Sequence, residues 1–145
     1  MLSQKARYAL RAMLHLAECK DEPSLQIADI AEQANVPRKF LEQILLDLKK
    51  RGLVHSTRGR HGGYRLARES NEISFAEIIR LIDGPLALSP CASRTAYRRC
   101  DDCTDETTCA IRKSLVDVRN ATARILEEHS LADALADRRK LKPGA

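Results

Sequence analysis

Four of the five cysteines lie in one short stretch, and their thiols are the side chains best suited to chemistry. Cys91, Cys100, Cys103 and Cys109 are separated by eight, two and five residues. Few large apolar residues lie between them, so a hydrophobic core cannot order this stretch. Four thiolates can hold an iron–sulfur cluster, and four also make a structural zinc site. The stretch therefore indicates a metal centre that orders its own loop.

Three kinds of cysteine chemistry remain open from these residues. The close pair Cys100 and Cys103 suits zinc, but zinc sites usually show two such pairs, and Cys91 and Cys109 have no close neighbour in sequence. A thiol switch without metal is the third alternative. Acidic neighbours should raise the pKa of the thiols and so disfavour a reactive thiolate. These neighbours are Asp101, Asp102, Asp105 and Glu106.

Composition favours one helical domain, or one domain with an appended arm, over the 145 residues. Hydrophobic residues make up 43% and aromatic residues 3%, so the core must be mostly aliphatic. No apolar run approaches the roughly 20 residues that span a membrane, and the first residues do not open a signal peptide. We therefore expect a cytoplasmic protein without membrane partners, in which the thiols stay reduced.

The net charge of +5 is concentrated in the first half of the chain. Residues 1–70 carry 13 basic and 8 acidic side chains, whereas residues 71–145 carry 12 of each. Residues 38–68 alone have nine basic and two acidic side chains. Scattered charge would indicate a solvated surface, but this concentration is typical of a surface that binds a polyanion.

Three helices are predicted in the first fifty residues. Ser3 is a suitable N-cap for a helix that continues to about Cys19. A short helix follows over 27–35, and Pro37 begins a third that Gly52 ends. The second and third predict a helix-turn-helix, although an ordinary helical hairpin has the same pattern. The apolar stripe of the third helix comprises Phe40, Leu41, Ile44, Leu45 and Leu48, and its candidates for base contacts are Arg38, Lys39, Glu42 and Gln43.

A glycine-rich hairpin directly after the third helix predicts the wing of a winged helix. Residues 53–56 and 64–66 have strand character, and residues 58–63 form the turn. Arginines at a wing tip can enter a narrow minor groove. A nucleotide-phosphate loop is the alternative, but no strand–loop–helix signature accompanies it. The expected DNA contacts of the wing are Arg58, Arg60, His61 and Tyr64.

The second half predicts a short helix and a long one on either side of the cysteines. A capping box over 74–77 starts the short helix, and Gly84 with Pro85 ends it. Over about 110–129, apolar residues recur at alternating spacings of four and three, which is a heptad seam. A helix packed on its own domain is the alternative to a dimer, and a twofold dimer would fit a palindromic operator. The expected dimer interface comprises Ile111, Leu115, Val118, Thr122 and Ile125.

The expected fold is mainly α with a small β-hairpin. It consists of a winged helix-turn-helix head over 1–70, a linking helix over 71–89 and a cysteine-rich, cluster-binding loop over 90–109. A dimerisation helix and a short C-terminal helix follow over 110–137, the latter centred on 131–135, and 138–145 is a basic tail.

Several segments between residue 2 and about residue 135 resemble the IscR/NsrR/RirA-type family of winged-helix transcription regulators. They are Lys5–Leu10, Ile27–Ala31, Val36–Gln43 and Gly52–Leu66. The resemblance implies a dimeric DNA-binding protein with an iron–sulfur cluster in the loop before the dimerisation helix. It also implies that loss or damage of the cluster changes DNA affinity. The ligand cysteines of the family correspond to Cys91, Cys103 and Cys109.

Two positions depart from the pattern of this family. Arg112 lies where the regulator of iron–sulfur biogenesis has a histidine ligand, and Arg7 lies where the nitric-oxide sensor has an aspartate ligand. Cys100 is therefore the candidate fourth ligand, and a labile fourth position is the alternative. The iron-responsive members are the closest analogy. The expected cofactor is a [2Fe–2S] or [4Fe–4S] cluster, with zinc as the less favoured alternative.

The expected function is a homodimeric, non-enzymatic transcription regulator, and more specifically a repressor. Its DNA affinity would report iron supply, cluster status, or redox or nitrosative stress. The first alternative keeps DNA binding but places zinc or a disulfide switch in the loop. The second is a redox protein that does not act on DNA. The four histidines are dispersed and no flavin or nucleotide pattern accompanies them, which disfavours the second alternative.

Overall fold

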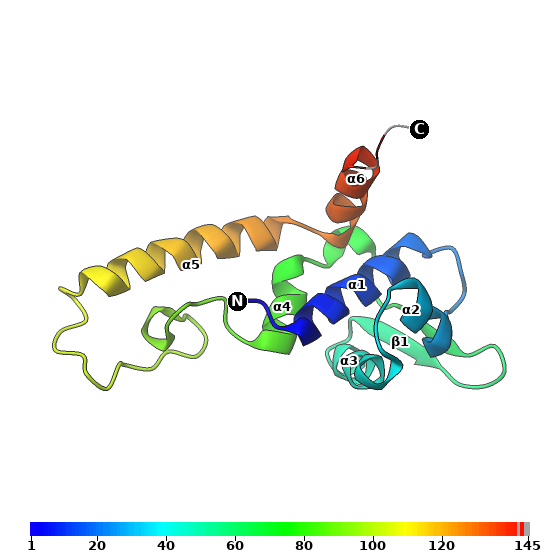
Figure 1. Ribbon diagram of the computed structural model, residues 1–145, viewed down its shortest axis with the longest axis horizontal. Helices are drawn as coiled ribbons and strands as arrows, with labels where there is room; N and C mark the ends of the chain where they lie inside the picture. Colours follow the sequence, from blue (N-terminus) through cyan, green and yellow to red (C-terminus); the bar gives the residue numbers. More distant parts are fainter. Residues whose placement is uncertain (142, 144–145) are drawn as a thin grey trace.

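The computed structural model describes residues 1–141 and 143, and it shows a helical head from which a long arm projects (Figure 1). The head contains α1 (Gln4–Glu18), α2 (Ile27–Gln33), α3 (Arg38–Lys50), β1 (Val54–Thr57), β2 (Gly63–Leu66), η1 (Ser70–Glu72) and α4 (Phe75–Asp83). The arm, residues 85–128, contains η2 (Pro90–Ala92), an extended loop and α5 (Ala110–Glu128). After the arm, α6 (Leu131–Leu141) packs against the head. The prediction of a mainly α fold with one small hairpin is confirmed.

Capping residues readable in the sequence set the ends of the helices. The Ser3 hydroxyl accepts a hydrogen bond of 3.0 Å from the backbone of Ala6, and the Ser74 hydroxyl accepts one of 3.2 Å from Glu77. Each satisfies a backbone N–H that has no partner within its helix. Gly84 ends α4 with a φ of +85°, a conformation that side chains other than glycine rarely adopt.

The core lies where α1, α3 and α4 pack together. Its apolar side chains are almost entirely aliphatic, as the scarcity of aromatic residues required, and Leu131 from α6 completes it. The largest fully buried members are Met13, Ile30, Leu41, Ile44, Leu45, Leu48, Leu53, Val54, Ile73, Ile78 and Leu131. One predicted member was wrong: Phe40 is 52% exposed, because it lies on the flank of α3 rather than on its buried face.

The wing is an antiparallel hairpin in which Val54 pairs with Leu66 and Thr57 with Gly63. A third backbone segment joins it through Leu25, whose N–H and carbonyl both bond to Tyr64 at 2.8 Å. A Cβ atom at Gly63 would lie 2.3 Å from the Leu25 oxygen, so only glycine permits this approach. The glycines of this sequence therefore serve the strand pairing as well as the turn.

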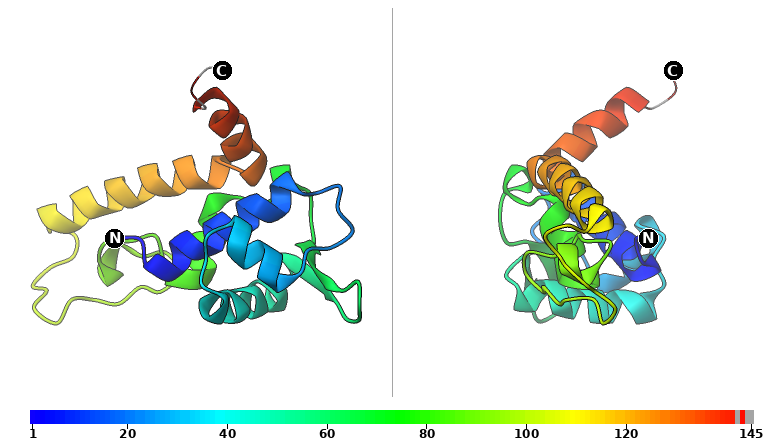
Figure 2. Two further views of the ribbon diagram at one scale, coloured as in Figure 1. Left: turned by 45° about the vertical axis from the view of Figure 1, so that its right-hand side comes forward. Right: turned by 90° about the vertical axis from the view of Figure 1, so that its left-hand side faces the viewer.

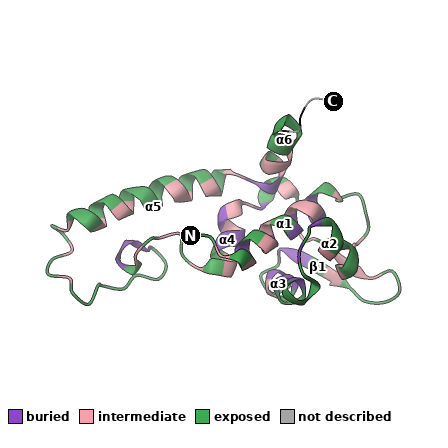
Figure 3. Cartoon of the chain, viewed as in Figure 1, coloured by how far each residue is buried: buried purple, intermediate pink, exposed green. Residues whose placement is uncertain are grey.

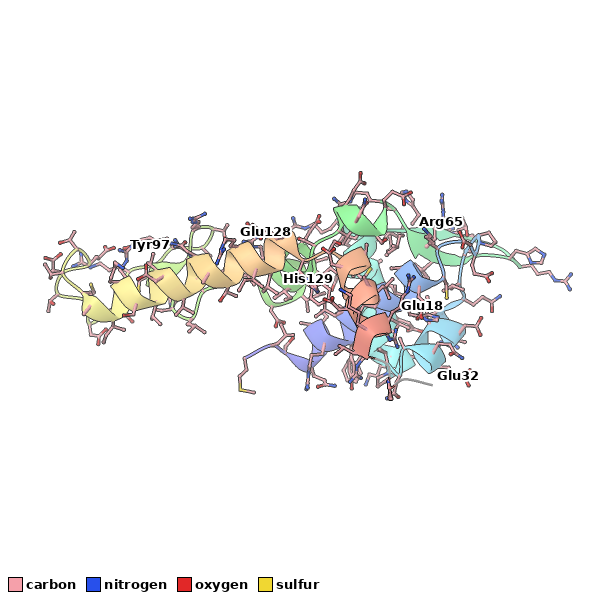
Figure 4. All side chains as sticks on the ribbon, turned by 90° about the horizontal axis from the view of Figure 1, so that it is seen from above. Glu18, Glu32, Arg65, Tyr97, Glu128 and His129 are labelled. Atoms are coloured by element: carbon pink, nitrogen blue, oxygen red, sulfur yellow. The ribbon has the colours of Figure 1, made fainter. Side chains whose placement is uncertain are left out.

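The α5 helix projects from the head as a rod, and the three views agree on this arrangement (Figures 1 and 2). None of its 19 residues is buried, as the absence of purple on this helix shows (Figure 3). Its C-terminal end is fixed to the head by a 2.6 Å ion pair between Arg80 and Glu127 and by an edge-to-face contact of Phe75 with His129. Figure 4 places His129 at the junction of α5 with the head.

The last helix is longer than predicted. The sequence interpretation gave a short helix over 131–135 and a basic tail over 138–145, but α6 continues to Leu141. Ser130 and Asp133 form a capping box that starts it, and Arg138 pairs with Glu18 of α1 at 3.2 Å. Arginine and lysine are good helix formers near a C-terminus, so positive charge did not mark the end of the helix. Residues 142, 144 and 145 of the predicted tail lie outside the described residues.

Candidate nucleic-acid interface and cysteine centre

The α3 helix presents a polar face to solvent opposite its buried apolar face. All four predicted base contacts, Arg38, Lys39, Glu42 and Gln43, are exposed on it. Arg38 pairs with Glu42 at 3.5 Å, within one turn of the helix. Such an exposed pair contributes little to stability and is free to exchange partners with a base edge or phosphate. The structure therefore leaves all four side chains accessible to a binding partner.

Asp47 on α3 bonds both to α1 and to a neighbouring side chain of its own helix. Its carboxylate accepts hydrogen bonds of 3.0 Å from Lys5 and from Gln43. Burial alone would raise the pKa of Asp47, but these two bonds together with the charges of Lys5 and Lys50 outweigh it, and the pKa is lowered. The Gln43 amide is thus already oriented by a neighbour, which the sequence pattern alone did not indicate.

The sequence does not predict an aromatic pair near the base-contact residues, formed by the exposed Phe40 and the half-buried Tyr8. The rings of Phe40 and Tyr8 lie 5.9 Å apart, and the Arg11 guanidinium lies 5.9 Å from the Tyr8 ring. We name Tyr8, Arg11 and Phe40 the aromatic patch. The exposed position of Phe40 could have been found from the helical wheel, because it lies about 90° from the centre of the buried stripe.

The wing places its charged side chains around an exposed tip. Arg58, Arg60 and His61 are all exposed, and the His61 carbonyl accepts a 2.9 Å hydrogen bond from Ser24. Tyr64 differs from them, because its side chain is half-buried and packs against the core. Arg65, one residue further on, is exposed and lies on the wing in Figure 4. The tip of the wing is therefore a positively charged loop, and the half-buried Tyr64 connects the wing to the core.

Arginines hold the cysteine segment, residues 90–109, along α5, where Cys91 and Ala92 at its start are buried. Arg112 donates from Nε to the carbonyl of Cys91 at 3.1 Å, and Arg119 donates from Nη1 to the carbonyl of Ala92 at 2.5 Å. Arg112 also donates its backbone N–H to the sulfur of Cys109 at 3.4 Å, which makes Cys109 the N-cap of α5. Two of the four cysteines are thus fixed to the first turn of α5.

The other two cysteines lie further out on the loop. Cys100 is exposed and Cys103 is half-buried, with its carbonyl accepting a 3.2 Å hydrogen bond from Arg99. All cysteines of the chain are free thiols. Within residues 1–141 and 143, no three His, Cys, Asp or Glu side chains are gathered closely enough to hold a metal ion. The four thiols therefore share one segment without converging on one point in this conformation.

The thiols of Cys91 and Cys100 influence each other. A hydrogen bond from the Ser89 hydroxyl, 3.3 Å from the sulfur, lowers the pKa of Cys91, and Cys100 and the Arg112 charge act in the same direction. The contact with Cys91 raises the pKa of Cys100, and Asp102 adds to that effect. Asp102 thus raises the pKa of Cys100 as predicted, whereas the pKa of the buried Cys91 is lowered by groups other than the acidic neighbours.

The predicted seam of α5 remains open to solvent. Ile111, Val118 and Ile125 are 73%, 45% and 60% exposed. Leu115 and Thr122 are half-buried. Large apolar side chains repeating along one face of a projecting helix are unusual on the surface of a monomer.

The α4 helix connects the elements described above. Glu77 pairs with Arg68 after the wing at 2.5 Å, and Arg80 pairs with Glu127 of α5 at 2.6 Å. At its C-terminal end, Asp83 accepts a 2.8 Å hydrogen bond from the backbone of Ser3 at the start of α1. The wing, the arm and α1 are therefore each attached to one nine-residue helix.

The fold and its exposed basic surface define a winged helix-turn-helix DNA-binding protein. Residues 2–137 match the Rrf2 family, which is described as comprising iron-dependent transcriptional regulators, and the chain belongs to this family. An rrf2-like HTH-type transcriptional regulator from Rhodobacter capsulatus is 47% identical over 139 residues, which cover 94% of this chain and 93% of that protein. The resemblance to winged-helix regulators predicted from the sequence is confirmed.

Two solved structures have the same architecture. CymR, the global cysteine regulator of B. subtilis, superimposes with a TM-score of 0.77 at 31% identity, covering 94% of this chain and 96% of CymR. IscR of T. potens gives a TM-score of 0.76 at 29% identity, covering 100% of this chain and 93% of IscR. The family consists of transcription regulators rather than enzymes, which confirms the non-enzymatic expectation. No helix within residues 1–141 has the length and apolarity needed to cross a membrane.

Proposed function

We propose that this protein is a homodimeric repressor that binds a palindromic operator through α3 and the wing. Its DNA affinity is set by an iron–sulfur cluster on the cysteine segment. Cys91, Cys103 and Cys109 are the ligands implied by the resemblance, and Cys100 is the candidate for the fourth. The description of the Rrf2 family as iron-dependent supports this assignment.

The observation that carries the proposal is the attachment of the thiols to α5. Cys109 caps the helix with its own sulfur, and Arg112 in the first turn holds the carbonyl of Cys91. Any group that draws Cys91 and Cys109 together must act on this first turn, because both are bonded to Arg112. The cysteine segment and α5 should therefore move together.

The donor set fits an iron–sulfur cluster by its chemistry. Four thiols lie within one segment, and the lowered pKa of Cys91 favours the deprotonated form that a metal requires. The exposed loop between Cys91 and Cys109 lacks large buried side chains, so ligation can reshape it at little cost in packing. A bound cluster would supply a group that iron limitation or oxidants can remove.

The residues of α4 supply a physical connection from the arm to the DNA-binding head. Arg80 joins α4 to α5, Glu77 joins it to the segment after the wing, and Asp83 joins it to α1. A change in the angle of α5 would move the wing and α1 through these contacts. In a twofold dimer, the same change alters the spacing of the two α3 helices, and with it the fit to two half-sites.

The test combines spectroscopy with DNA binding on one anaerobic preparation. We expect absorption and Mössbauer spectra of an iron–sulfur cluster in the wild type, and loss of these spectra in a Cys103→Ala variant. The Arg80→Gln variant is the control for coupling. It should keep the spectra but show a smaller difference in DNA affinity between cluster-bound and cluster-free protein. A colourless wild type with one zinc per chain would contradict the cluster assignment.

A thiol switch is the second candidate, and one observation favours it. Cys91 and Cys100 shift each other's pKa in opposite directions, so the two thiols influence each other without a metal. Native mass spectrometry separates the candidates, because a disulfide lowers the mass by about 2 Da, whereas zinc or a cluster raises it. Retention of a cluster by a Cys100→Ala variant would show that this thiol is not a required ligand.

A further inference from the structure

We propose that Phe40 is a specificity-determining residue that contacts the C5-methyl group of a thymine in the operator, with Tyr8 and Arg11 supporting its ring. The inference goes beyond the four polar base contacts of α3. It rests on the entry of α3 into the major groove, and it does not depend on the state of the cysteine segment.

The position of Phe40 on the helix places it beside the expected base contacts. It is the third residue of α3, and the N-terminal turns of a recognition helix are the part that reaches base edges. Arg38 and Lys39 precede it directly, and both are exposed. Phe40 therefore lies at the edge of the face that carries the expected base contacts, and it can offer only an apolar contact.

The exposure of this ring is not explained by packing within the chain. The chain has two phenylalanines, and Phe75 packs against the core whereas Phe40 is 52% exposed. The Tyr8 ring lies 5.9 Å from it at an interplanar angle of 40°, and so braces one side. Arg11 is held near Tyr8 and donates to the Asn35 carbonyl at 3.4 Å. The supported ring is thus held in place while one side stays open.

The charges around the aromatic patch favour DNA over a protein partner as the occupant. Arg38 and Lys39 precede Phe40 on α3, Arg11 lies beside the Tyr8 ring that contacts it, and the acidic Glu42 is paired with Arg38. Positive side chains around an apolar ring match a thymine, whose methyl group lies in the major groove between two phosphate backbones. Apolar contact with this methyl group is an established way to distinguish thymine from cytosine.

The test removes the methyl group and the ring separately. A binding duplex is first selected from random-sequence DNA with the full-length protein. Each thymine is then replaced in turn by deoxyuridine, which lacks only the methyl group. For the wild type, one thymine in each half-site should lose about fourfold in affinity on replacement, the effect of burying one methyl-sized group. The Phe40→Ala variant should bind the thymine and deoxyuridine duplexes equally, and Phe40→Leu should restore part of the difference.

The control variant is Leu88→Ala, which removes an exposed apolar side chain outside the head and should keep the full methyl effect. Circular dichroism of Phe40→Ala checks that the variant folds, as expected for a half-exposed side chain. Equal methyl effects in the wild type and Phe40→Ala, or no methyl effect in the wild type, would overturn the inference but leave the proposed regulator intact. Failure to select any duplex would overturn both. A Phe40→Ala variant that binds every duplex normally but fails in repression would instead assign the patch to a protein partner.

Discussion

Replacing Ile125 by alanine should weaken the dimer more than any other single truncation near the C-terminal end of α5. Ile125 continues the seam begun by Ile111 and Val118, and it lies where the rod is anchored to the head. In a twofold dimer, each change removes two side chains from the interface. Alanine is a good helix former, so the substitution should weaken dimer association rather than the folding of the protomer.

The magnitude follows from the exposed fraction of this side chain. Complete burial of an isoleucine stabilises by roughly 1.5–3 kcal/mol. Ile125 is 60% exposed in the protomer, so covering it contributes about 1–2 kcal/mol per copy and about 2–4 kcal/mol per dimer. The dimer dissociation constant should therefore rise by about 30- to 1000-fold.

Sedimentation velocity over a concentration series measures this constant directly. The matched control is Arg124→Ala, a truncation at the adjacent exposed position, which lies off the seam. It should leave the dissociation constant within about twofold of the wild type, as is usual for surface substitutions. Equal constants for Ile125→Ala and Arg124→Ala, or a wild type that is monomeric at every concentration, would refute the reasoning.

Three further outcomes are expected. Arg58→Ala at the wing tip should weaken binding to all duplexes and lower the salt slope by about 0.9 per lost phosphate contact, or about 2 per dimer, in anisotropy titrations; an unchanged slope would exclude the contact. Gly63→Ala should destabilise by roughly 2–4 kcal/mol in urea unfolding, because its Cβ would lie 2.3 Å from a backbone oxygen. Gly59→Ala, with a φ of +103° but open space around it, should cost only about 1 kcal/mol, and equal losses would contradict the packing argument. Hydrogen bonds from the Ser130 backbone and hydroxyl lower the pKa of Asp133 in the folded protein. The ionised Asp133 therefore stabilises the folded protein above the unfolded pKa of about 3.9, and this stabilisation is lost as pH falls through the lower folded pKa. Asp133→Asn should reduce the acid sensitivity of the unfolding midpoint, and an unchanged pH profile would show that the capping box does not contribute.

The helix-turn-helix and the wing were predictable because their signals are local. The Ser3 and Ser74 caps, the apolar stripe of α3 and the glycine turn each lie within a few residues of the element that they define. The β-bridge formed by Leu25 was not predicted, since a single residue carries no strand periodicity. Its pairing with Tyr64 depends on how α1 and α2 place their connection against the hairpin.

Most of the structural features that the sequence did not predict depend on contacts between distant segments. Phe40 is an exception, because its assignment to the apolar stripe of α3 overlooked its place on the flank of that helix, which a helical wheel gives. The hydrogen bonds of Arg112 and Arg119 to the cysteine segment join residues 21 and 27 positions apart, so no local spacing predicts these two anchors. The length of α6 depended on the pairing of Arg138 with Glu18, which are 120 residues apart.

The prediction of the four thiols as one site stays open, and so does that of the seam. The sequence places the cysteines close together along the chain, but their convergence depends on a ligand that supplies the energy to gather them. Likewise, the exposure of Ile111, Val118 and Ile125 agrees with an interface, yet a second chain is needed to cover them. Both predictions concern what the chain binds, which its own packing does not determine.

The most direct test of the proposed mechanism is a DNA titration of one preparation before and after removal of its iron. The selected duplex is titrated anaerobically with cluster-bound protein and again after chelation, with iron measured in each sample. We predict that the dissociation constant changes by about 5- to 150-fold, the range of typical coupling between two sites, and that a Cys109→Ala variant shows no change. An iron-containing wild type whose affinity is the same in both forms would contradict the account.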